Sequence, residues 1–469
     1  MPLNKSDIRR NILYAFGAQV VSLVLSIIMT LIVPKILGVK AFSYWQLFIF
    51  YTSYGGFLHL GLYDGIYLRF GGVSYKELNY VMLGWQFAIS MIWQIIICFI
   101  ISLFTYIYIT GDRVFIIVSS CLCILISNSI FFFGYILQAV NNIKYYSISI
   151  MIEKMLLIIL IIISLFLKKQ NYELLIVLYI TCRCIALLYN SFHCKEITKA
   201  IKINRYPPIE ELKKNIGCGL ILAFSNVSSM LILGIGRFFI DVNFGIIEFG
   251  KVSFSIIMIN FFIVFMSQIS IVIFPVLRRV DSNNLKLYFV KFNRILTAFL
   301  PIIFLLYTPI YFFVNHWIPD YKDSLFYFIF LFPLCCYEGK MQMLNNTFMK
   351  VLREEKKLLL FNIISCIISI VLTLVSIYIF HSITIVVLSM LIALCIRSSI
   401  TELFLSYKYA VVIRNDVLLL WGLTVIFIIL HVYLSIFLAS FTFLCLYCIY
   451  LLKYKDCVVA LKVNMRWIK

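Results

Sequence analysis

The sequence predicts an all-α, polytopic membrane protein. Hydrophobic residues make up 63% of the 469 positions and charged residues only 13%, and the mean hydropathy is +1.04. A soluble domain of this length would carry far more charge. Apolar runs recur from Asn11 to Leu452 and do not alternate polar with apolar residues. They therefore fit transmembrane helices rather than the strands of a barrel.

These runs predict about 14 transmembrane helices. The first run follows a basic stretch, as in a signal peptide, but it is longer than a signal-peptide core and no small-x-small cleavage site follows it, so we assign it as the first membrane helix. The last two runs are close to the minimum length for spanning. We place the helices at residues 11–33, 43–63, 81–109, 114–139, 146–167, 172–192, 216–240, 252–274, 295–314, 324–348, 358–380, 383–406, 417–434 and 436–452.

The distribution of Lys and Arg predicts that both termini are cytoplasmic. With the N-terminus inside, the inner connections hold 28 of the 40 Lys and Arg residues, the outer connections hold six, and six lie within helices. This bias follows the positive-inside rule and requires an even number of spans. Basic inner loops facing anionic headgroups also explain the net charge of +20. We therefore expect membrane lipids as partners, no nucleic acid, and a bacterial cytoplasmic (inner) membrane as the location.

Residues 193–215 are predicted to divide the chain into two halves. This inner connection contains Pro207-Pro208 and has the pattern of an amphipathic helix at the membrane surface. It separates an N-terminal six-helix lobe, 1–192, from a C-terminal six-helix lobe, 216–406. Residues 407–469 then form an extra helix pair and a basic cytoplasmic tail.

A weak internal repeat accompanies this division. Shifting the first half by about 207 residues aligns Gly38 with Gly245 and Phe42 with Phe249. Internal repeats are common in transporter folds, and six helices separate equivalent positions, so the two halves would be parallel repeats.

No pattern in the sequence indicates catalysis, a metal or a cofactor. The 14 cysteines lie mostly inside predicted helices and lack metal-ligand or disulfide spacing, so we interpret them as small packing residues. The five histidines form no cluster, and His316 alone shares an outer connection with acids, where a structural role is favoured. A phosphate-binding GxxxxGK[ST] motif is also absent from the sequence.

Several segments resemble those of a known family. The first half contains LGVKAFSYW and LGLYDGI, ILQAVNNIKYYS covers the inner turn after the fourth predicted helix, and GRFFIDVNFGIIEFGKVSFS lies near the start of the second half. Together with the length, the helix count and the short loops, these segments resemble the Wzx-type O-antigen translocases. These are lipid-linked oligosaccharide flippases of the multidrug/oligosaccharidyl-lipid/polysaccharide (MOP) exporter superfamily.

The resemblance implies a fold and a substrate. The two six-helix lobes would be related by a pseudo-two-fold axis and enclose a cavity that opens alternately to each side. The substrate would be an undecaprenyl-diphosphate-linked oligosaccharide, moved from the cytoplasmic to the periplasmic leaflet for O-antigen, lipopolysaccharide or other surface polysaccharide synthesis. A polysaccharide polymerase and a chain-length regulator would be partners. Gly236-Arg237 departs from relatives that carry an aspartate beside the arginine, which puts ion coupling at this point in doubt.

Charged residues inside the predicted helices are the candidate site. Ionisable groups within a bilayer are costly, so each is a functional hypothesis. A cavity lined by cations would attract the diphosphate headgroup, because arginine and lysine bind phosphate oxygens. The alternative is that the cations pair with nearby acids and fix the helix packing. The substrate-binding candidates are Arg183, Arg397, Arg237, Lys251, Lys154 and Lys340, and the candidates for ion coupling are Asp64, Glu153 and Glu338.

Three other functions compete with this hypothesis. A drug/cation antiporter of the same superfamily would favour acids in the cavity, whereas this chain buries mostly cations. A peptidoglycan-precursor flippase fits a cationic cavity, but its opening motifs match less well. A membrane polysaccharide polymerase typically needs a large outer loop with catalytic residues, and every outer connection here is short. The sequence leaves the sugar composition, the coupling ion and the oligomeric state open.

Overall fold

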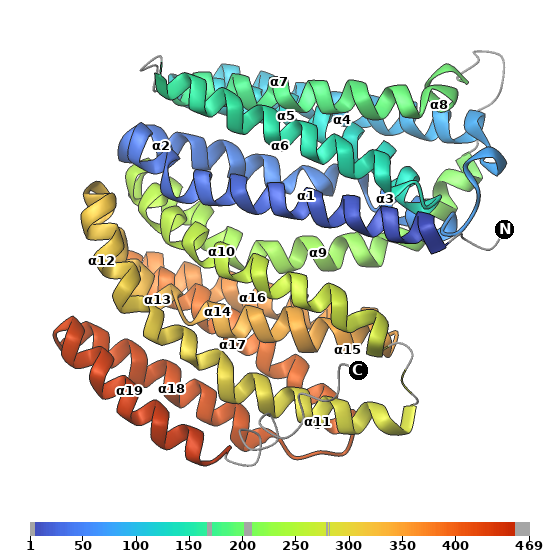
Figure 1. Ribbon diagram of the computed structural model, residues 1–469. Helices are drawn as coiled ribbons and strands as arrows, with labels where there is room; N and C mark the ends of the chain where they lie inside the picture. Colours follow the sequence, from blue (N-terminus) through green and yellow to red (C-terminus); the bar gives the residue numbers. More distant parts are fainter. Residues whose placement is uncertain (1–4, 167–170, 201–208, 278–279, 281, 455–469) are drawn as a thin grey trace. The chain divides into compact units, whose positions relative to one another are not determined.

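The computed structural model describes residues 5–166, 171–200, 209–277, 280 and 282–454, and every regular element in these ranges is helical (Figure 1). The all-α polytopic class is therefore confirmed. Contacts divide the chain into unit 1, Met1–Val227, and unit 2, Ser228–Lys469, so the boundary falls inside one long helix, α9. The centre of the predicted linker and the predicted basic tail lie outside the described residues.

Unit 1 is built around α5, in which half of the residues of the most apolar stretch are buried. Helix α5 contacts α2, α4 and α7, while α1 packs along α6 and α6 along α7 (Figure 1). The elements are α1 (Lys5–Leu31), α2 (Val33–Ser53), the 3₁₀ helix η1 (Tyr54–His59), α3 (Leu62–Arg69), η2 (Tyr75–Glu77), α4 (Tyr80–Tyr108), α5 (Asp112–Ala139), α6 (Ile143–Phe166), α7 (Tyr172–His193), α8 (Lys195–Lys199) and the first part of α9 (Ile209–Phe244).

Unit 2 is built around α10 and α17, and in each helix 56% of the residues of the most apolar stretch are buried. Helix α10 packs on α13, α14 and α15, α16 lies along α17, and α18 pairs with α19. The elements after α9 are α10 (Ile246–Leu277), α11 (Ser282–Phe299), η3 (Leu300–Leu306), α12 (Tyr307–Trp317), η4 (Pro319–Tyr321), α13 (Ser324–Leu331), α14 (Leu334–Lys340), the π-helical segment η5 (Met341–Asn345), α15 (Asn346–Val351), α16 (Glu355–Tyr378), α17 (Ile383–Lys408), α18 (Arg414–Tyr433) and α19 (Ile436–Leu452).

The helices correspond to the predicted spans. Within the described residues, 11 stretches are long and apolar enough to cross a membrane, and each coincides with one predicted span. The other three predicted spans are 43–63, 324–348 and 436–452. The first two are interrupted helices, and the third is α19, which has only 17 residues.

A buried polar network holds the break in span 43–63. The Asn128 side chain on α5 donates to the Gly55 carbonyl at 2.8 Å and to Gln94 Oε1 at 2.7 Å. Gln94 in turn donates to the Tyr63 hydroxyl at 3.0 Å and to Ser90 at 2.8 Å. The carbonyl of Gly55, in the 3₁₀ turn of η1, therefore accepts a hydrogen bond from a side chain of another helix.

Two tyrosines from α19 stabilise the break between α11 and α12. Pro301 has no N–H, so it cannot donate to the carbonyl of Thr297 four residues earlier. The Tyr450 hydroxyl donates to this carbonyl at 2.8 Å, and the Tyr447 hydroxyl donates to the carbonyl of Ala298 at 2.9 Å. Helix α19 thus supplies hydrogen bonds that the interrupted helix lacks.

The aligned positions of the predicted repeat have the same local structure in each unit. Gly38 has φ +67° and kinks α2, and Gly245 has φ +90° and separates α9 from α10. A left-handed backbone of this kind favours glycine. Phe42 and Phe249, each four residues later, are fully buried. These shared features support the repeat.

Helices α3 and α9 touch backbone to backbone in unit 1. A Cβ on Gly65 would lie 1.8 Å from the carbonyl oxygen of Asn215, and a Cβ on Gly219 would lie 2.0 Å from that of Gly61. Only glycine permits so close an approach. The crossing therefore fixes the first part of α9 against α3.

Polar contacts extend this crossing toward the start of α9. Arg69 donates to Asn215 Oδ1 at 2.5 Å and to Glu211 Oε2 at 2.8 Å, and the Asn215 amide donates to Gln86 at 2.8 Å. Residues 209–215, assigned to the linker from the sequence, are thus the first two turns of α9.

Candidate functional site

The predicted site residues fall into separate groups within each unit. Unit 1 brings Lys154 and Arg183 together with Glu153. Unit 2 holds the other four cations in three groups, which are centred on Arg397, Lys340 and the pair formed by Arg237 and Lys251. The cations with a carboxylate within ion-pair distance include Lys154, Arg183, Lys251, Lys340 and Arg397.

The Arg183 cluster joins three helices of unit 1. The Arg183 Nε lies 3.4 Å from Glu153 Oε1 on α6, one Nη donates to Ser127 on α5, and the other donates to the Tyr179 hydroxyl at 2.6 Å. The guanidinium carbon also lies 4.7 Å from the centroid of the Tyr179 ring, which is a cation–π distance. Arg183 is therefore held in one orientation by neighbours on α5, α6 and α7.

The Arg183 cluster carries an excess positive charge. The Lys154 ammonium lies 3.7 Å from the same Glu153 oxygen, so two cations share one carboxylate. The Lys154 side chain is 24% exposed, whereas Glu153 is 8% exposed. Among the residues that the structure describes, no second carboxylate lies within ion-pair distance of these two cations, so one positive charge is uncompensated, and the three N–H donors of the Lys154 ammonium are not all used by Glu153. This arrangement suits an anionic ligand.

Arg397 lies near the middle of α17 in unit 2, and its charge is compensated. It donates to Glu338 Oε1 at 2.8 Å and to Asn362 Oδ1 at 2.9 Å. The Arg397 side chain is 3% exposed and that of Glu338 is 12% exposed. These contacts bind α17 to α14 and α16, as expected for an ion pair that fixes helix packing.

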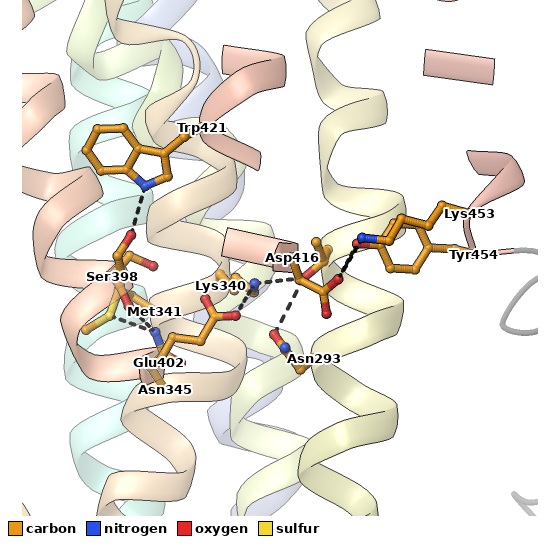
Figure 2. A network of polar contacts seen from close by, with 12 residues as sticks. Asn293, Lys340, Met341, Asn345, Ser398, Glu402, Asp416, Trp421, Lys453 and Tyr454 are labelled. Atoms are coloured by element: carbon orange, nitrogen blue, oxygen red, sulfur yellow. Dashed lines mark hydrogen bonds and ion pairs between the residues drawn. The ribbon is translucent and has the colours of Figure 1, made fainter. Parts of the chain in front are cut away.

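Lys340 is completely buried beside the π-helical segment of span 324–348. Its ammonium donates to Glu402 Oε1 on α17 and to the Thr297 hydroxyl on α11, both at 2.7 Å, as Figure 2 shows for Glu402. Asn345, at the end of the π segment, donates to the carbonyl of Ser398 at 3.2 Å. Lys340 therefore links the interrupted helices to α17 and has no exposed surface for a substrate.

Lys251 and Arg237 lie near the junction of α9 and α10. Lys251 pairs with Glu248 at 2.9 Å and with Asp323 at 3.1 Å, and Glu248 also accepts from the Tyr327 hydroxyl at 2.7 Å. Arg237 donates to Ser253 at 3.0 Å, and its guanidinium carbon lies 5.1 Å from the Phe249 ring centroid. Two carboxylates surround Lys251, so this group carries no excess positive charge.

The three candidates for ion coupling differ in their surroundings. Glu153 and Glu338 each pair with an arginine. Asp64, in the first turn of α3, is 7% exposed and forms no ion pair within the described part of the chain. Tyr135 on α5 lies close enough to interact electrostatically with this carboxyl group. A buried carboxyl without a cation is costly when ionised, so Asp64 is the most suitable of the three to bind a proton or a small cation.

The sequence did not identify several partners of these cations. Tyr179 lies four residues before Arg183 on the same helix, so helical spacing could have indicated this contact. Ser127, Asn362 and Thr297 come from distant segments, and no local pattern marks them. In the described ranges, no group of three His, Cys, Asp or Glu residues is arranged to hold a metal ion.

Comparisons by sequence give no assignment, since no protein-family model and no curated protein matches the chain. Solved structures do match. Lipid II flippase MurJ, in an inward closed conformation, gives a TM-score of 0.68 at 11% identity, with 96% of this chain and 99% of that chain covered. An inward-facing multidrug resistance MATE family transporter of the MOP superfamily gives 0.58 at 13% identity, with 84% and 94% covered. A point mutant of a MATE protein gives 0.50 at 13% identity, with 87% and 96% covered.

These matches establish the fold. The chain shares the fold of lipid II flippase MurJ over nearly its whole length and that of a MATE transporter of the MOP superfamily over most of it, while membership of that superfamily stays a prediction from the sequence. The similar structures are those of flippases and transporters. At such low identity the likeness concerns the fold alone, and the Wzx-type branch stays a prediction.

Proposed function

We propose that this protein flips undecaprenyl-diphosphate-linked oligosaccharides from the cytoplasmic to the periplasmic leaflet by alternating access, in the synthesis of O-antigen or another surface polysaccharide. The observation that carries the proposal is the Arg183 cluster, which places an excess positive charge among membrane helices. The fold it shares with a lipid II flippase supports the same activity.

Lys154 is the group best placed to contact the headgroup. A diphosphate carries about two negative charges, and an ammonium binds phosphate oxygens as a point charge. Arg183 is already bonded to Ser127 and Tyr179, so its contribution is to keep Glu153 partly neutralised and the local potential positive. The polyprenyl tail would stay in the lipid. Lys340 and Arg397 are assigned to helix packing instead.

The membrane potential supplies a driving force for this direction. Moving two negative charges outward is favoured by about 4–5 kcal/mol at about 100 mV, from about 2.3 kcal/mol per charge. The proposal takes the protein to lie in a bacterial cytoplasmic membrane with both termini inside, as the distribution of Lys and Arg predicts. A polymerase and a chain-length regulator would then act on the translocated units.

Asp64 is the proposed coupling residue for exchange with a cation. Its carboxyl group is buried and has no ion pair with any residue that the structure describes, whereas Glu153 and Glu338 each pair with an arginine. Asp64→Asn keeps the shape and removes the titratable group. We expect this variant to flip substrate at the same rate with or without an imposed proton gradient, while the wild type responds to the gradient. An unchanged response in the variant would exclude Asp64 as the carrier.

The function is tested by reconstitution. Purified protein in liposomes receives fluorescent undecaprenyl-diphosphate oligosaccharide, and a membrane-impermeant quencher reports the outer leaflet. Parallel samples contain lipid II or an organic cation, which test the peptidoglycan-precursor flippase and the drug antiporter. Protein-dependent flipping of the oligosaccharide lipid supports the proposal. Transport of the organic cation alone, under any potential or ion gradient, would replace it with the antiporter.

A further inference from the structure

A cavity of about 380 Å³ lies within unit 2, apart from the Arg183 cluster. It is formed between α12, α13 and the C-terminal pair of α18 and α19. This volume is within the range of small-ligand pockets, about 300–1,000 Å³. Four polar side chains that can form further hydrogen bonds line this cavity, and most of the other lining residues are apolar. The polar members are Tyr311, Lys322, His431 and Ser435.

The cavity presents two donors without partners. Lys322 is exposed and forms no ion pair with the residues that the structure describes. The hydroxyl of Tyr311 makes no hydrogen bond within the same residues, although the neighbouring Tyr307 hydroxyl donates to the carbonyl of Leu325 at 3.4 Å. An ammonium and a phenol that converge on one space suit phosphate oxygens.

One residue of the cavity lining, His431, holds a buried hydrogen-bond acceptor that has no partner among the described residues. The His431 Nδ1 lies 2.9 Å from the carbonyl oxygen of Phe427, which can only accept, so Nδ1 carries the proton of the neutral ring. The other nitrogen, Nε2, is therefore an acceptor, and it is buried without a hydrogen-bond partner. Leaving this acceptor unsatisfied is costly, so a ligand hydroxyl that reaches it when the His431 ring turns toward the cavity is favoured.

The rim of the cavity is apolar and exposed. Phe326 is 46% exposed, Leu434 is 37% exposed, and the adjacent Phe437 and Tyr433 are 69% and 80% exposed. Aromatic residues of this kind gather at membrane interfaces. Both connections that border the cavity, 315–323 and 434–435, are outer connections in the topology predicted from the charges. The polar groups would then lie at the level of the outer lipid headgroups.

We propose that this cavity binds the headgroup of an anionic lipid in the outer leaflet, one whose phosphate carries a hydroxylated group. Lys322 and Tyr311 hold the phosphate, and His431, with its ring turned toward the cavity, accepts a hydrogen bond from the hydroxyl through Nε2. Two lipids share this chemistry: a phospholipid with a glycerol headgroup, and the translocated carrier with its sugar. Binding of the carrier rests on the proposed function, whereas binding of the phospholipid does not.

The site is tested by binding rather than by flipping. Native mass spectrometry of the full chain in detergent measures the affinity for short-chain phosphatidylglycerol, for phosphatidylcholine with the same tails, and for undecaprenyl-diphosphate oligosaccharide. We expect one of the two hydroxylated anionic lipids to bind at least tenfold more tightly than phosphatidylcholine. Tighter binding of phosphatidylglycerol identifies a bound membrane lipid, and tighter binding of the carrier identifies a product site.

Matched variants locate the binding. Lys322→Gln and Tyr311→Phe should each weaken the preferred lipid about tenfold, which is the loss of one charge-assisted hydrogen bond. Lys40→Gln, which removes an exposed cation from a predicted outer connection of unit 1, should leave the affinity unchanged. Equal binding of phosphatidylcholine, or equal losses in Lys322→Gln and Lys40→Gln, would overturn the proposal. Neither result bears on whether the protein flips its substrate.

Discussion

Replacing Lys340 by methionine removes the cation that contacts the buried carboxylate of Glu402. The two side chains are 0% and 3% exposed and lie 2.7 Å apart, so water cannot replace the lost partner. The Thr297 hydroxyl, also 2.7 Å from the Lys340 ammonium, loses the same neighbour. Removing one member of a buried ion pair costs about 3–5 kcal/mol, because the other charge stays buried and unpaired. We expect Lys340→Met to lower the free energy of unfolding by this amount.

The double variant Lys340→Met with Glu402→Leu separates this explanation from a simple packing defect. Replacing a buried ion pair by apolar side chains of similar size is often nearly neutral. The free energies of unfolding of the wild type, both single variants and the double variant form a double-mutant cycle, measured by titration with a denaturing detergent. If the double variant is no more stable than Lys340→Met, or if Lys340→Met costs less than about 1 kcal/mol, the pair is not sealed from water as described.

Two further substitutions test the interrupted helix and the helix crossing. Tyr450→Phe removes the hydroxyl that donates to the Thr297 carbonyl, and it should lower the free energy of unfolding by about 1–3 kcal/mol in the same titration. Its control, Tyr433→Phe at an 80% exposed position, should change the free energy of unfolding by less than about 0.5 kcal/mol. Gly65→Ala would place a Cβ 1.8 Å from the Asn215 carbonyl oxygen, so it should lower the free energy of unfolding by about 3 kcal/mol or more. In its control, Gly217→Ala, the new Cβ meets no atom within 4 Å, so the substitution should be neutral or stabilising. Equal effects within either pair would contradict the packing described here.

The sequence predicted the spans but not their interruptions. Long apolar runs located the helices, because burial in lipid depends on composition over about 20 residues. The 3₁₀ turn at Gly55 depends on Asn128, 73 positions away, and the break at Pro301 depends on tyrosines from the last helix. Such contacts are tertiary, so local patterns do not reveal them. Gly38 and Gly245 were exceptions, since the repeat itself drew attention to both.

The sequence offered the candidate residues of the site but did not predict how they pair. The cost of a charge in a membrane singled out Arg183 and Arg397 from their positions in the sequence. That Arg183 shares Glu153 with Lys154, while Arg397 has Glu338 to itself, follows from the packing of helices in each unit. This difference in compensation, rather than the number of cations, separates the candidate headgroup site from the structural ion pairs.

The most direct test of the account compares flipping by three proteins reconstituted at equal density. These are the wild type, Lys154→Gln, and the double variant Lys340→Met with Glu402→Leu. The oligosaccharide-lipid assay with the impermeant quencher measures the initial rate for each. We predict that Lys154→Gln loses at least tenfold in rate, because it removes the excess charge, while the double variant keeps the wild-type rate. Full activity of Lys154→Gln would contradict the assignment of the headgroup site to the Arg183 cluster.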